Sequence, residues 1–289
     1  MPFTANDAGG MAALPLGAVR REVERHRGAE ASRVADAIAE EIPVGFVYNG
    51  RPHAVMMATP ADLEDFARGF SLSEAIVASP RECEKVEIVP ALAGIELHIT
   101  IPAVRAGRLE DRVRELTGRT GCGLCGAQTL EAAIRHPPPV ADPASIDANA
   151  LRWALSDLHR RQTINVATGA THAAAWAGAQ GDIALVREDV GRHNALDKLI
   201  GAMQRQRIDA REGFLIVTSR ASYEMVMKAA TAGIGTLAAI SAPTALAIAL
   251  AQETNVTLIG FARADGYSVY AHAERVHDGA GAPAGRVQS

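Results

Sequence analysis

The chain has 289 residues, of which 48% are hydrophobic and 21% charged, a composition typical of a packed globular protein. Its formal net charge of −4 argues against a nucleic-acid-binding protein, which usually carries a basic excess, and its 4% of aromatic residues argues against a stacking platform for single strands. The three cysteines are too few for a disulfide-stabilised secreted protein, so we expect a cytoplasmic protein.

Residues 1–38 are predicted to form a disordered or extended tail. Their apolar run has no basic residue before it, and Arg20 and Arg21 come after it, which is the reverse of a secretory signal. One uncharged stretch, 229–251, has the length of a membrane span. The helix-start signal "SAPT" at 241–244 interrupts this stretch, so we predict a buried strand and a buried helix there and expect no membrane span.

Residues 39–117 are predicted to form a small α+β unit. A tight turn at Asn49-Gly50 joins its first two strands, and "TPAD" at 59–62 has the pattern of a helix start, with a capping hydroxyl on Thr59. The predicted elements are strands at 42–48, 53–59, 85–90 and 95–101, a helix from 59 to about 77, and an arginine-rich amphipathic helix at 105–117.

A Gly-rich cysteine loop and a Pro-rich linker are expected at 118–146, because four prolines lie within 136–145. Strands and helices alternate in 147–275, which is the pattern of an α/β domain. The predicted fold class is therefore α/β, a mainly parallel sheet with helices on both faces, together with the smaller α+β unit. Residues 276–289 are expected to be a disordered tail. The predicted strands of the domain are 182–187, 213–219, 235–241 and 256–262, and its helices are 147–161, 191–205, 220–231 and 243–253.

The stretch "TGRTGCGLCGAQ", 117–128, places Cys122 and Cys125 among glycines. A structural zinc site needs four ligands, but the chain has no second cysteine pair, and its nearest histidine pair, His272 and His277, is spaced one residue too widely. A dithiol redox motif normally opens a helix, which the flanking glycines disfavour. A carrier of persulfide sulfur suits a mobile loop, so sulfur transfer fits the pair best, with zinc binding and redox chemistry as the alternatives.

Polar residues gather where predicted strands meet predicted helices, which is the usual ligand edge of an α/β sheet. Backbone N–H groups at such helix starts can bind an anion, so we expect an anion or nucleotide crevice; ordinary helix caps with i,i+4 pairs are the alternative. The sequence contains neither a P-loop nor a dinucleotide-binding glycine motif. The candidate residues are Arg192, His193, Asn194 and Lys198 in "REDVGRHNALDKLIGA"; Ser219, Arg220 and Ser222 in "VTSRASYEM"; Ser241 and Thr244 in "ISAPTAL"; and His172 in "TGATHAAAW", where the Glu of the deaminase H-x-E motif is missing.

Taken together, these stretches resemble the formate dehydrogenase accessory sulfurtransferase family, the FdhD proteins. The resemblance spans about residues 41–272 and is carried by "VGFVYNG", "MMATPADLEDFARGFSLSEAI", "GRTGCGLCG", "TGATHAAAW", "EDVGRHNALDKLIGA", "SRASYEMVMKAATAG", "SAPTALA" and "LIGFARADGYSVYAH". Ala75 departs from the family pattern, which more often has Gly at this position. The resemblance implies a cytidine-deaminase-like three-layer domain and a homodimer.

The resemblance also implies a function. Such proteins accept persulfide sulfur from a cysteine desulfurase and pass it to the molybdenum or tungsten bis(molybdopterin guanine dinucleotide) cofactor that formate dehydrogenase requires. It assigns Cys122 as the persulfide carrier and Cys125 as its partner; no resident metal is expected, and GDP or GMP should mimic one end of the cofactor. A cofactor-binding chaperone without sulfur transfer and a zinc-stabilised nucleotide-binding module are the alternatives. The cofactor-binding segment of the family matches Phe261, Ala262, Arg263, Ala264, Asp265 and Gly266.

Overall fold

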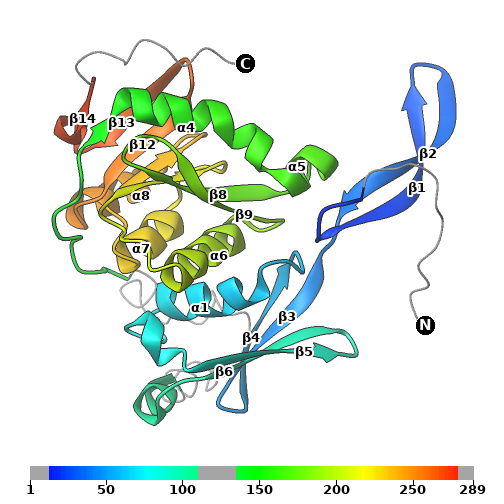
Figure 1. Cartoon of the computed structure of the whole chain (residues 1–289), viewed down its shortest axis with the longest axis horizontal. Coiled ribbons are helices and arrows are strands. Elements are labelled where there is room, and N and C mark those ends of the chain that lie inside the picture. The colour runs from blue at the N-terminus through cyan, green and yellow to red at the C-terminus, as the bar shows by residue number, and fades with distance from the viewer. Residues whose placement is uncertain (1–12, 110–134, 279–289) are drawn as a thin grey trace.

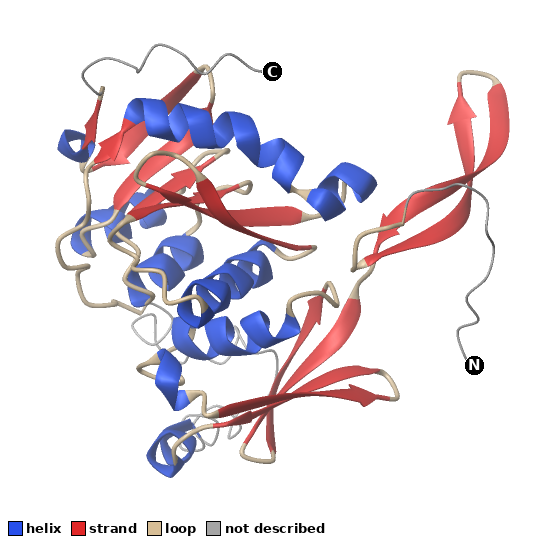
Figure 2. Ribbon diagram, in the orientation of Figure 1, coloured by secondary structure: helices blue, strands red, loops and turns tan. Residues whose placement is uncertain are grey.

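The computed structural model describes residues 13–109 and 135–278. The larger part of the molecule is an α/β domain built around a six-stranded sheet with the strand order β13-β12-β11-β10-β8-β9 (Figures 1 and 2). The four strands predicted for this domain are confirmed to within about two residues at each end. The strands are β8 (His172–Gly178), β9 (Ile183–Asp189), β10 (Gly213–Val217), β11 (Thr236–Ala239), β12 (Thr257–Arg263) and β13 (Gly266–Ala271).

The sheet is mixed, whereas the sequence predicted a mainly parallel one. β10, β11 and β12 are parallel, but β8 is antiparallel to both β9 and β10, and β13 is antiparallel to β12. The sequence of β8, "HAAAWAG", is mostly alanine, which has a low strand propensity, and this hides the strand from pattern analysis. Because β8 runs against β10, its first residue lies at the edge where the parallel strands end.

Helices lie on both faces of this sheet (Figure 2). On one face, α4 (Ala148–Arg161) packs against strand side chains such as Phe214 of β10. The next residue along β10, Leu215, points to the opposite face, as expected for a strand. That face is covered by α6 (Arg192–Arg205), α7 (Tyr223–Thr231) and α8 (Ala245–Glu253), and the short helix α5 (Thr163–Thr168) follows α4.

The smaller unit is a four-stranded sheet with the order β4-β3-β6-β5, and it confirms the four predicted strands. The turn at Asn49-Gly50 is confirmed by the left-handed φ angles of both residues, 48° and 80°. One helix, α1 (Leu63–Ser73), packs on the sheet and joins it to the core of the larger domain. The strands are β3 (Ile42–Tyr48), β4 (Arg51–Ala58), β5 (Lys85–Ala91) and β6 (Gly94–Thr100).

Both ends of α1 differ from the prediction. The residue before the helix is Asp62, with a left-handed φ of 53°, so the hydroxyl of Thr59 does not cap it. The helix ends at Ser73 rather than near Val77, because the chain turns back at Ala75, where φ is 54°. Glycine adopts this φ without strain, so a glycine would suit this position better than Ala75.

Helices α1 and α6 approach each other closely at two glycines. A Cβ atom on Gly69 of α1 would lie 1.7 Å from the carbonyl oxygen of Asp197, and one on Gly201 of α6 would lie 1.9 Å from that of Asp65. Only glycine fits at such a separation. The two units therefore share one continuous apolar core across this helix pair.

Residues 18–39, most of which were expected in a disordered or extended tail, form a hairpin, and residues 1–12 lie outside the described residues. Strands β1 (Ala18–Arg27) and β2 (Glu30–Ala39) pair along their whole length, and the hairpin extends away from both sheets (Figure 1). Its base packs against α5. The sequence does not reveal these strands because both faces of the arm are largely exposed, so neither strand needs an apolar face.

The Pro-rich linker packs along the larger domain. The backbone of Val140 accepts a hydrogen bond from Asn255 Nδ2 at 2.8 Å, and its N–H donates to Thr254 O at 2.9 Å. Residues 276–277, expected in a disordered tail, form the short strand β14 (Val276–His277), which pairs with β7 (Ile146–Asp147). Residues 103–109 are helical, and the remainder of the helix predicted at 105–117 lies outside the described residues. Within 13–109 and 135–278, no helix is long and apolar enough to cross a membrane.

Candidate functional site

The polar stretches singled out in the sequence meet at one edge of the six-stranded sheet. Because β10, β11 and β12 are parallel, the loops that follow them lie at the same edge. The antiparallel strand β8 brings its first residue, His172, to this edge, opposite Asp189 at the end of β9. We call this region the polar edge; it comprises His172 and the segments 190–194, 218–224, 240–244 and 261–266.

Direct contacts join these segments into one wall. Nε2 of His193, at the start of α6, lies 2.7 Å from Oε2 of Glu224, in the first turn of α7. The loop before α8 is tied to the loop before α7 by the hydrogen bond from Thr244 N to Ala221 O, at 3.0 Å. Phe261 N in turn donates to Ser241 O at 3.2 Å. The predicted candidates on four successive loops are therefore brought together.

The polar edge contains hydrogen-bond donors that have no partner in the described part of the chain. Arg192 Nε and Ser222 Oγ are buried atoms with no hydrogen-bond partner among the described residues. Arg220 and Arg263 are exposed, and neither pairs with a carboxylate in the described part of the chain. Ser219, by contrast, is buried, and its hydroxyl donates to Arg220 O at 3.0 Å. Three arginines and an unpaired hydroxyl favour an anionic ligand, such as a phosphate.

Two titratable groups of the polar edge have shifted pKa values. Burial lowers the pKa of His172, and the nearby Arg192 and His193 lower it further, so the imidazole is neutral at neutral pH. The contact with His193, whose Nε2 lies 2.7 Å from Glu224 Oε2, is the main cause that lowers the pKa of Glu224, so this carboxylate is ionised. The edge therefore combines a neutral imidazole with a carboxylate that orients a second histidine.

The segment 261–266 forms the outer part of the polar edge. Phe261 has a φ of 49°, a rare conformation for a bulky residue, and its side chain is 48% exposed beside a bulge in β12. The segment contributes Phe261, Arg263, Asp265 and Gly266 to an open hollow of about 310 Å³. Ala264 is exposed, whereas Ala262 is buried and packs with the core on the α4 side, away from any ligand. A strained, exposed aromatic residue beside charged groups is typical of a binding site.

Two candidate ligand residues, Asn194 and Lys198, instead fasten α6 to the loop before α1. Lys198 is 0% exposed; its Nζ lies 2.6 Å from Asp189 Oδ2 and donates to Thr59 O at 2.8 Å. Asn194 Nδ2 donates to Asp189 Oδ1 at 3.0 Å and to Met57 O at 2.8 Å. In this conformation neither side chain is free to contact a ligand. Their contacts are tertiary rather than those of a helix cap or an i,i+4 pair, because α6 begins after Gly191 without a side-chain cap.

The structure brings three residues to the polar edge that the sequence did not indicate as candidates. Glu224 and Tyr223 directly follow Ser222, and their place within "VTSRASYEM" was a usable signal. Arg135 accepts a hydrogen bond from the hydroxyl of Tyr223, which is 88 positions later in the chain. No local sequence pattern predicts this contact. Such long-range contacts need the folded chain.

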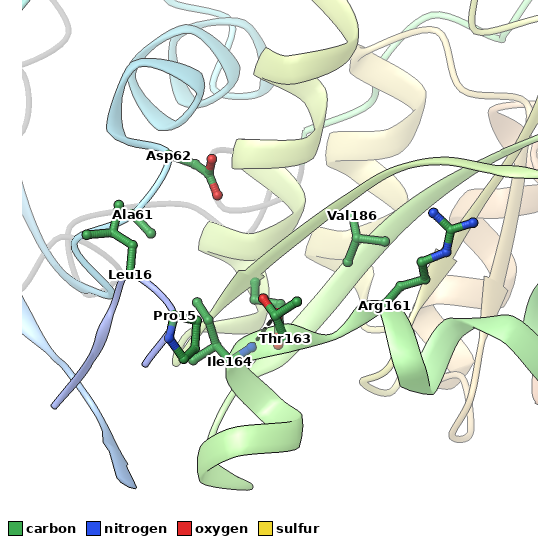
Figure 3. Close-up of a pocket in the computed structure, with 9 residues that line it drawn as sticks. Pro15, Leu16, Ala61, Asp62, Arg161, Thr163, Ile164 and Val186 are labelled. Atoms are coloured by element: carbon green, nitrogen blue, oxygen red, sulfur yellow. Dashed lines mark hydrogen bonds between the residues drawn. The ribbon is translucent and has the colours of Figure 1, made fainter. Parts of the chain in front are cut away.

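Cys122 and Cys125 lie outside the described residues, so the geometry of the thiol pair is not part of this site. Within 13–109 and 135–278, no group of three or more His, Cys, Asp or Glu side chains is placed to hold a metal ion. A cavity of about 200 Å³ lies where the base of the hairpin meets α5 and β9 (Figure 3), and none of the predicted site residues lines it. Its lining residues are Pro15, Leu16, Ala61, Asp62, Arg161, Thr163, Ile164, Val186 and Glu188.

Comparison with known proteins identifies the family. The model of the FdhD/NarQ family matches residues 39–277. The chain belongs to the FdhD/NarQ family. The match includes the polar edge and the segment with both cysteines, so the resemblance noted in the sequence is confirmed at the level of the family.

Curated relatives and a solved structure agree with this placement. The sulfur carrier protein FdhD of Xanthomonas euvesicatoria pv. vesicatoria (strain 85-10) is 58% identical over 260 residues, which cover 90% of this chain and 92% of the relative. The protein of the same name from Bordetella petrii is 54% identical over 246 residues, covering 85% and 88%. A crystal structure from Desulfotalea psychrophila, named for a formate dehydrogenase accessory role, shares the fold with a TM-score of 0.69 at 22% identity and covers 91% of this chain and 100% of its own.

Proposed function

We propose that this protein is a sulfur carrier in the maturation of formate dehydrogenase. Cys122 accepts persulfide sulfur from a cysteine desulfurase and delivers it to the molybdenum or tungsten bis(molybdopterin guanine dinucleotide) cofactor. Family membership and the sulfur carriers among the relatives support the sulfur-transfer part. The observation that carries the proposal is the contact between Arg135, the first described residue after the cysteine segment 110–134, and Tyr223 at the polar edge.

This contact holds the first described residue after the cysteines next to the polar edge. The ten peptide links between Cys125 and Arg135 span at most about 35 Å when fully extended. Tyr223 is adjacent to Ser222, whose hydroxyl is one of the unpaired donors. A chain of this length is long enough for a thiol to reach a cofactor at the polar edge, which supports the proposal.

The side chains of the polar edge suit the guanine dinucleotide end of such a cofactor. Arg192 and Ser222 offer unpaired donors to a pyrophosphate, and Arg220 adds an exposed guanidinium. The exposed ring of Phe261 offers a stacking surface for a base, and the carboxylate of Asp265 can accept hydrogen bonds from the N–H groups of guanine. GDP is accordingly the simplest probe of this binding site.

The sulfur passes through two exchange steps. The Cys122 thiolate attacks the outer sulfur of the desulfurase persulfide, so that Cys122 becomes the persulfide and the desulfurase thiolate leaves. In the second step the Cys125 thiolate attacks the inner sulfur, a Cys122–Cys125 disulfide forms, and the outer sulfur leaves as hydrosulfide to bind the metal of the cofactor. A cellular thiol reductant then returns the disulfide to two thiols. This chemistry belongs in a reducing compartment, so we place the protein in the cytoplasm. The resemblance to the family is the ground on which we also expect a homodimer.

Mass spectrometry of the full chain tests the carrier assignment. After incubation with a cysteine desulfurase and cysteine, without reductant, the peptide with Cys122 should gain about one sulfur, roughly 32 Da. Cys122→Ser should abolish this gain and the activation of formate dehydrogenase, while the affinity for GDP stays the same. Cys125→Ser is the matched control: it should still be loaded at Cys122 but should activate the enzyme poorly.

The alternatives predict different results. A chaperone that only shields the cofactor would bind GDP, gain no sulfur, and activate the enzyme equally well with Cys122→Ser. A zinc-stabilised module would gain no sulfur and would contain about one zinc ion per chain, which both Cys→Ser variants would lose.

A further inference from the structure

The hairpin of β1 and β2 extends from the body of the protein with two free strand edges (Figure 1). Among the described residues, each of these strands pairs only with the other, and most of their side chains are exposed. An isolated two-stranded hairpin is marginally stable in water, and a long free edge is a template for another strand. The exposed outer part of the hairpin is therefore suited to pair with a strand from another molecule.

The base of the hairpin, by contrast, is fixed to the rest of the chain. Glu40 N donates to Gly17 O at 2.8 Å, and Ala18 N donates to Pro15 O at 3.1 Å. Gly17 has a φ of 89°, and a Cβ atom there would collide with Cγ2 of Thr59, in the loop before α1. Because the base packs tightly against this loop and against α5, the hairpin leaves the body in a defined direction.

The edge of β1 is unsuited to pairing with a second copy of itself. When the same strand of two copies pairs about a two-fold axis, the strands are antiparallel and the pairing is centred on one residue. Every such register of β1 centred on one of residues 20–25 places like charges opposite each other. With Val23 at the centre, for example, Glu22 opposes Glu24. Like charges directly opposite each other destabilise a strand pair.

The edge of β2 carries fewer charges and is self-complementary. Registers centred on Val34 or Ala35 oppose no like charges, and the Val34 register also places the two Val34 side chains in contact. Because Val23 lies opposite Val34 in the hairpin, this register forms a row of four valines across one face of a four-stranded sheet. The other opposed pairs are Arg33 with Ala35, Ser32 with Asp36, Ala31 with Ala37 and Glu30 with Ile38.

The backbone groups of β2 suit the same register. The two-residue turn at 28–29 is closed by a hydrogen-bonded pair, so the even-numbered residues of β2 bond to β1. The N–H and C=O groups of the odd-numbered residues, such as Arg33 and Ala35, therefore point to the free edge. In the register centred on Val34 these two residues lie opposite each other, so they can exchange both hydrogen bonds.

We infer that the free edge of β2 pairs with β2 of a second copy and forms a four-stranded antiparallel sheet across a two-fold axis. The interface is isologous, because the same strand contributes to it from both copies. The inference stands on the geometry and the charges of the hairpin and is independent of sulfur transfer. It supplies an interface for the homodimer that we expect.

A proline variant of the full chain tests this interface. Ala35→Pro removes an N–H group from the free edge of β2 and keeps the hydrogen bonds to β1. Two bonds are lost across the two-fold axis, one from each copy. Analytical ultracentrifugation should show a dimer for the wild type, and the dissociation constant of the dimer should rise about tenfold or more in Ala35→Pro.

Glu22→Pro is the matched control. Glu22 lies directly opposite Ala35 in the hairpin, and its N–H points to the free edge of β1. This variant should change Tm as Ala35→Pro does and should leave dimerisation unchanged. An equal loss of the dimer in Glu22→Pro would assign the effect to the stability of the hairpin and would overturn the inference.

A pair of charged variants tests the register. Residue 35 lies opposite Arg33 of the second copy, so Ala35→Lys should weaken the dimer, more strongly at low salt, and Ala35→Glu should not. Equal weakening by both charges would overturn the register centred on Val34. A wild type that stays monomeric at every concentration overturns the inference, as does an Ala35→Pro variant that dimerises like the wild type. These measurements involve neither sulfur nor ligand, so a failure of this interface is distinguished from a failure of the proposed sulfur transfer.

Discussion

Replacement of Lys198 by methionine separates a structural role from a ligand-binding role. Methionine has a similar length and no charge, so Lys198→Met removes the cation from Asp189, which is completely buried. Breaking a buried ion pair by removing one partner costs about 3–5 kcal/mol, because the remaining charge is buried without compensation. Asp189 keeps the donors Thr59 N, Gly191 N and Asn194 Nδ2, so we expect the lower end of this range.

The expected loss of about 3 kcal/mol corresponds to a fall in Tm of roughly 6–12 °C for a chain of this size. The assay is thermal unfolding of the variant together with calorimetric titration of GDP at a temperature where both proteins are folded. GDP affinity should be unchanged, because Lys198 is enclosed between α6 and the loop before α1.

A double-mutant cycle with Asp189→Asn supplies the control. If the two side chains act as a pair, the double variant should be less destabilised than the sum of the single variants by about 1–3 kcal/mol. The opposite pattern, a tenfold loss of GDP affinity in Lys198→Met with Tm within 2 °C of the wild type, would refute our reading and return Lys198 to the ligand site.

Three further predictions follow from single residues. Gly69→Ala should separate α1 from α6 and destabilise the protein by about 3 kcal/mol or more, measured by urea unfolding, whereas Gly107→Ala, with no atom within 4 Å of its new Cβ, should not. Phe261→Gly should relieve the left-handed φ and keep or raise Tm while weakening GDP binding; unchanged binding would contradict a ligand role for the ring. Burial raises the pKa of Glu74, but Lys228 and Arg135 outweigh burial and lower this pKa from 4.5 to about 2. The ionised carboxylate therefore stabilises the folded state above pH 4.5 by on the order of 3 kcal/mol. That stability should disappear as the pH falls from about 5 to 2, and Glu74→Gln should flatten this part of the curve of unfolding free energy against pH.

The parts of the fold that the sequence predicted are those whose signals are local. The turn at Asn49-Gly50 and the strands around it could be read directly, because the turn chemistry and the strand pattern agree. The direction of β8 could not, because its alanines carry no strand signal and its antiparallel pairing is decided by contacts with β9 and β10. The end of α1 was placed too late, since its apolar pattern continues past Ser73 while the backbone turns at Ala75.

In the candidate site, too, some features could be predicted from local sequence and others could not. The polar residues near the strand ends were recognisable, because the carboxyl ends of parallel strands must meet at one edge. Which of them keep an unpaired donor could not be recognised. Asn194 and Arg192 lie two positions apart at the start of the same helix, yet Asn194 bonds to Asp189 and Arg192 keeps an unpaired Nε. That distinction depends on the loop before α1. Thr59 of this loop donates its N–H to Asp189, which is 130 positions later in the chain.

The cations of this protein fall into two groups that have different partners. Lys198 and Lys228 are buried, and the Nζ atom of each lies within 3 Å of a carboxylate oxygen. Their charges are therefore neutralised inside the fold, where these ion pairs hold α6 and α7 to the smaller unit. Arg192, Arg220 and Arg263 have no carboxylate partner among the described residues, although Asp and Glu side chains outnumber Lys and Arg in the chain, 33 to 29. In an acidic protein, three unpaired arginines at one edge of a sheet concentrate positive potential there. The buried pairs hold α6 and α7 to the smaller unit, and the unpaired arginines give the polar edge a positive charge that would suit an anionic ligand.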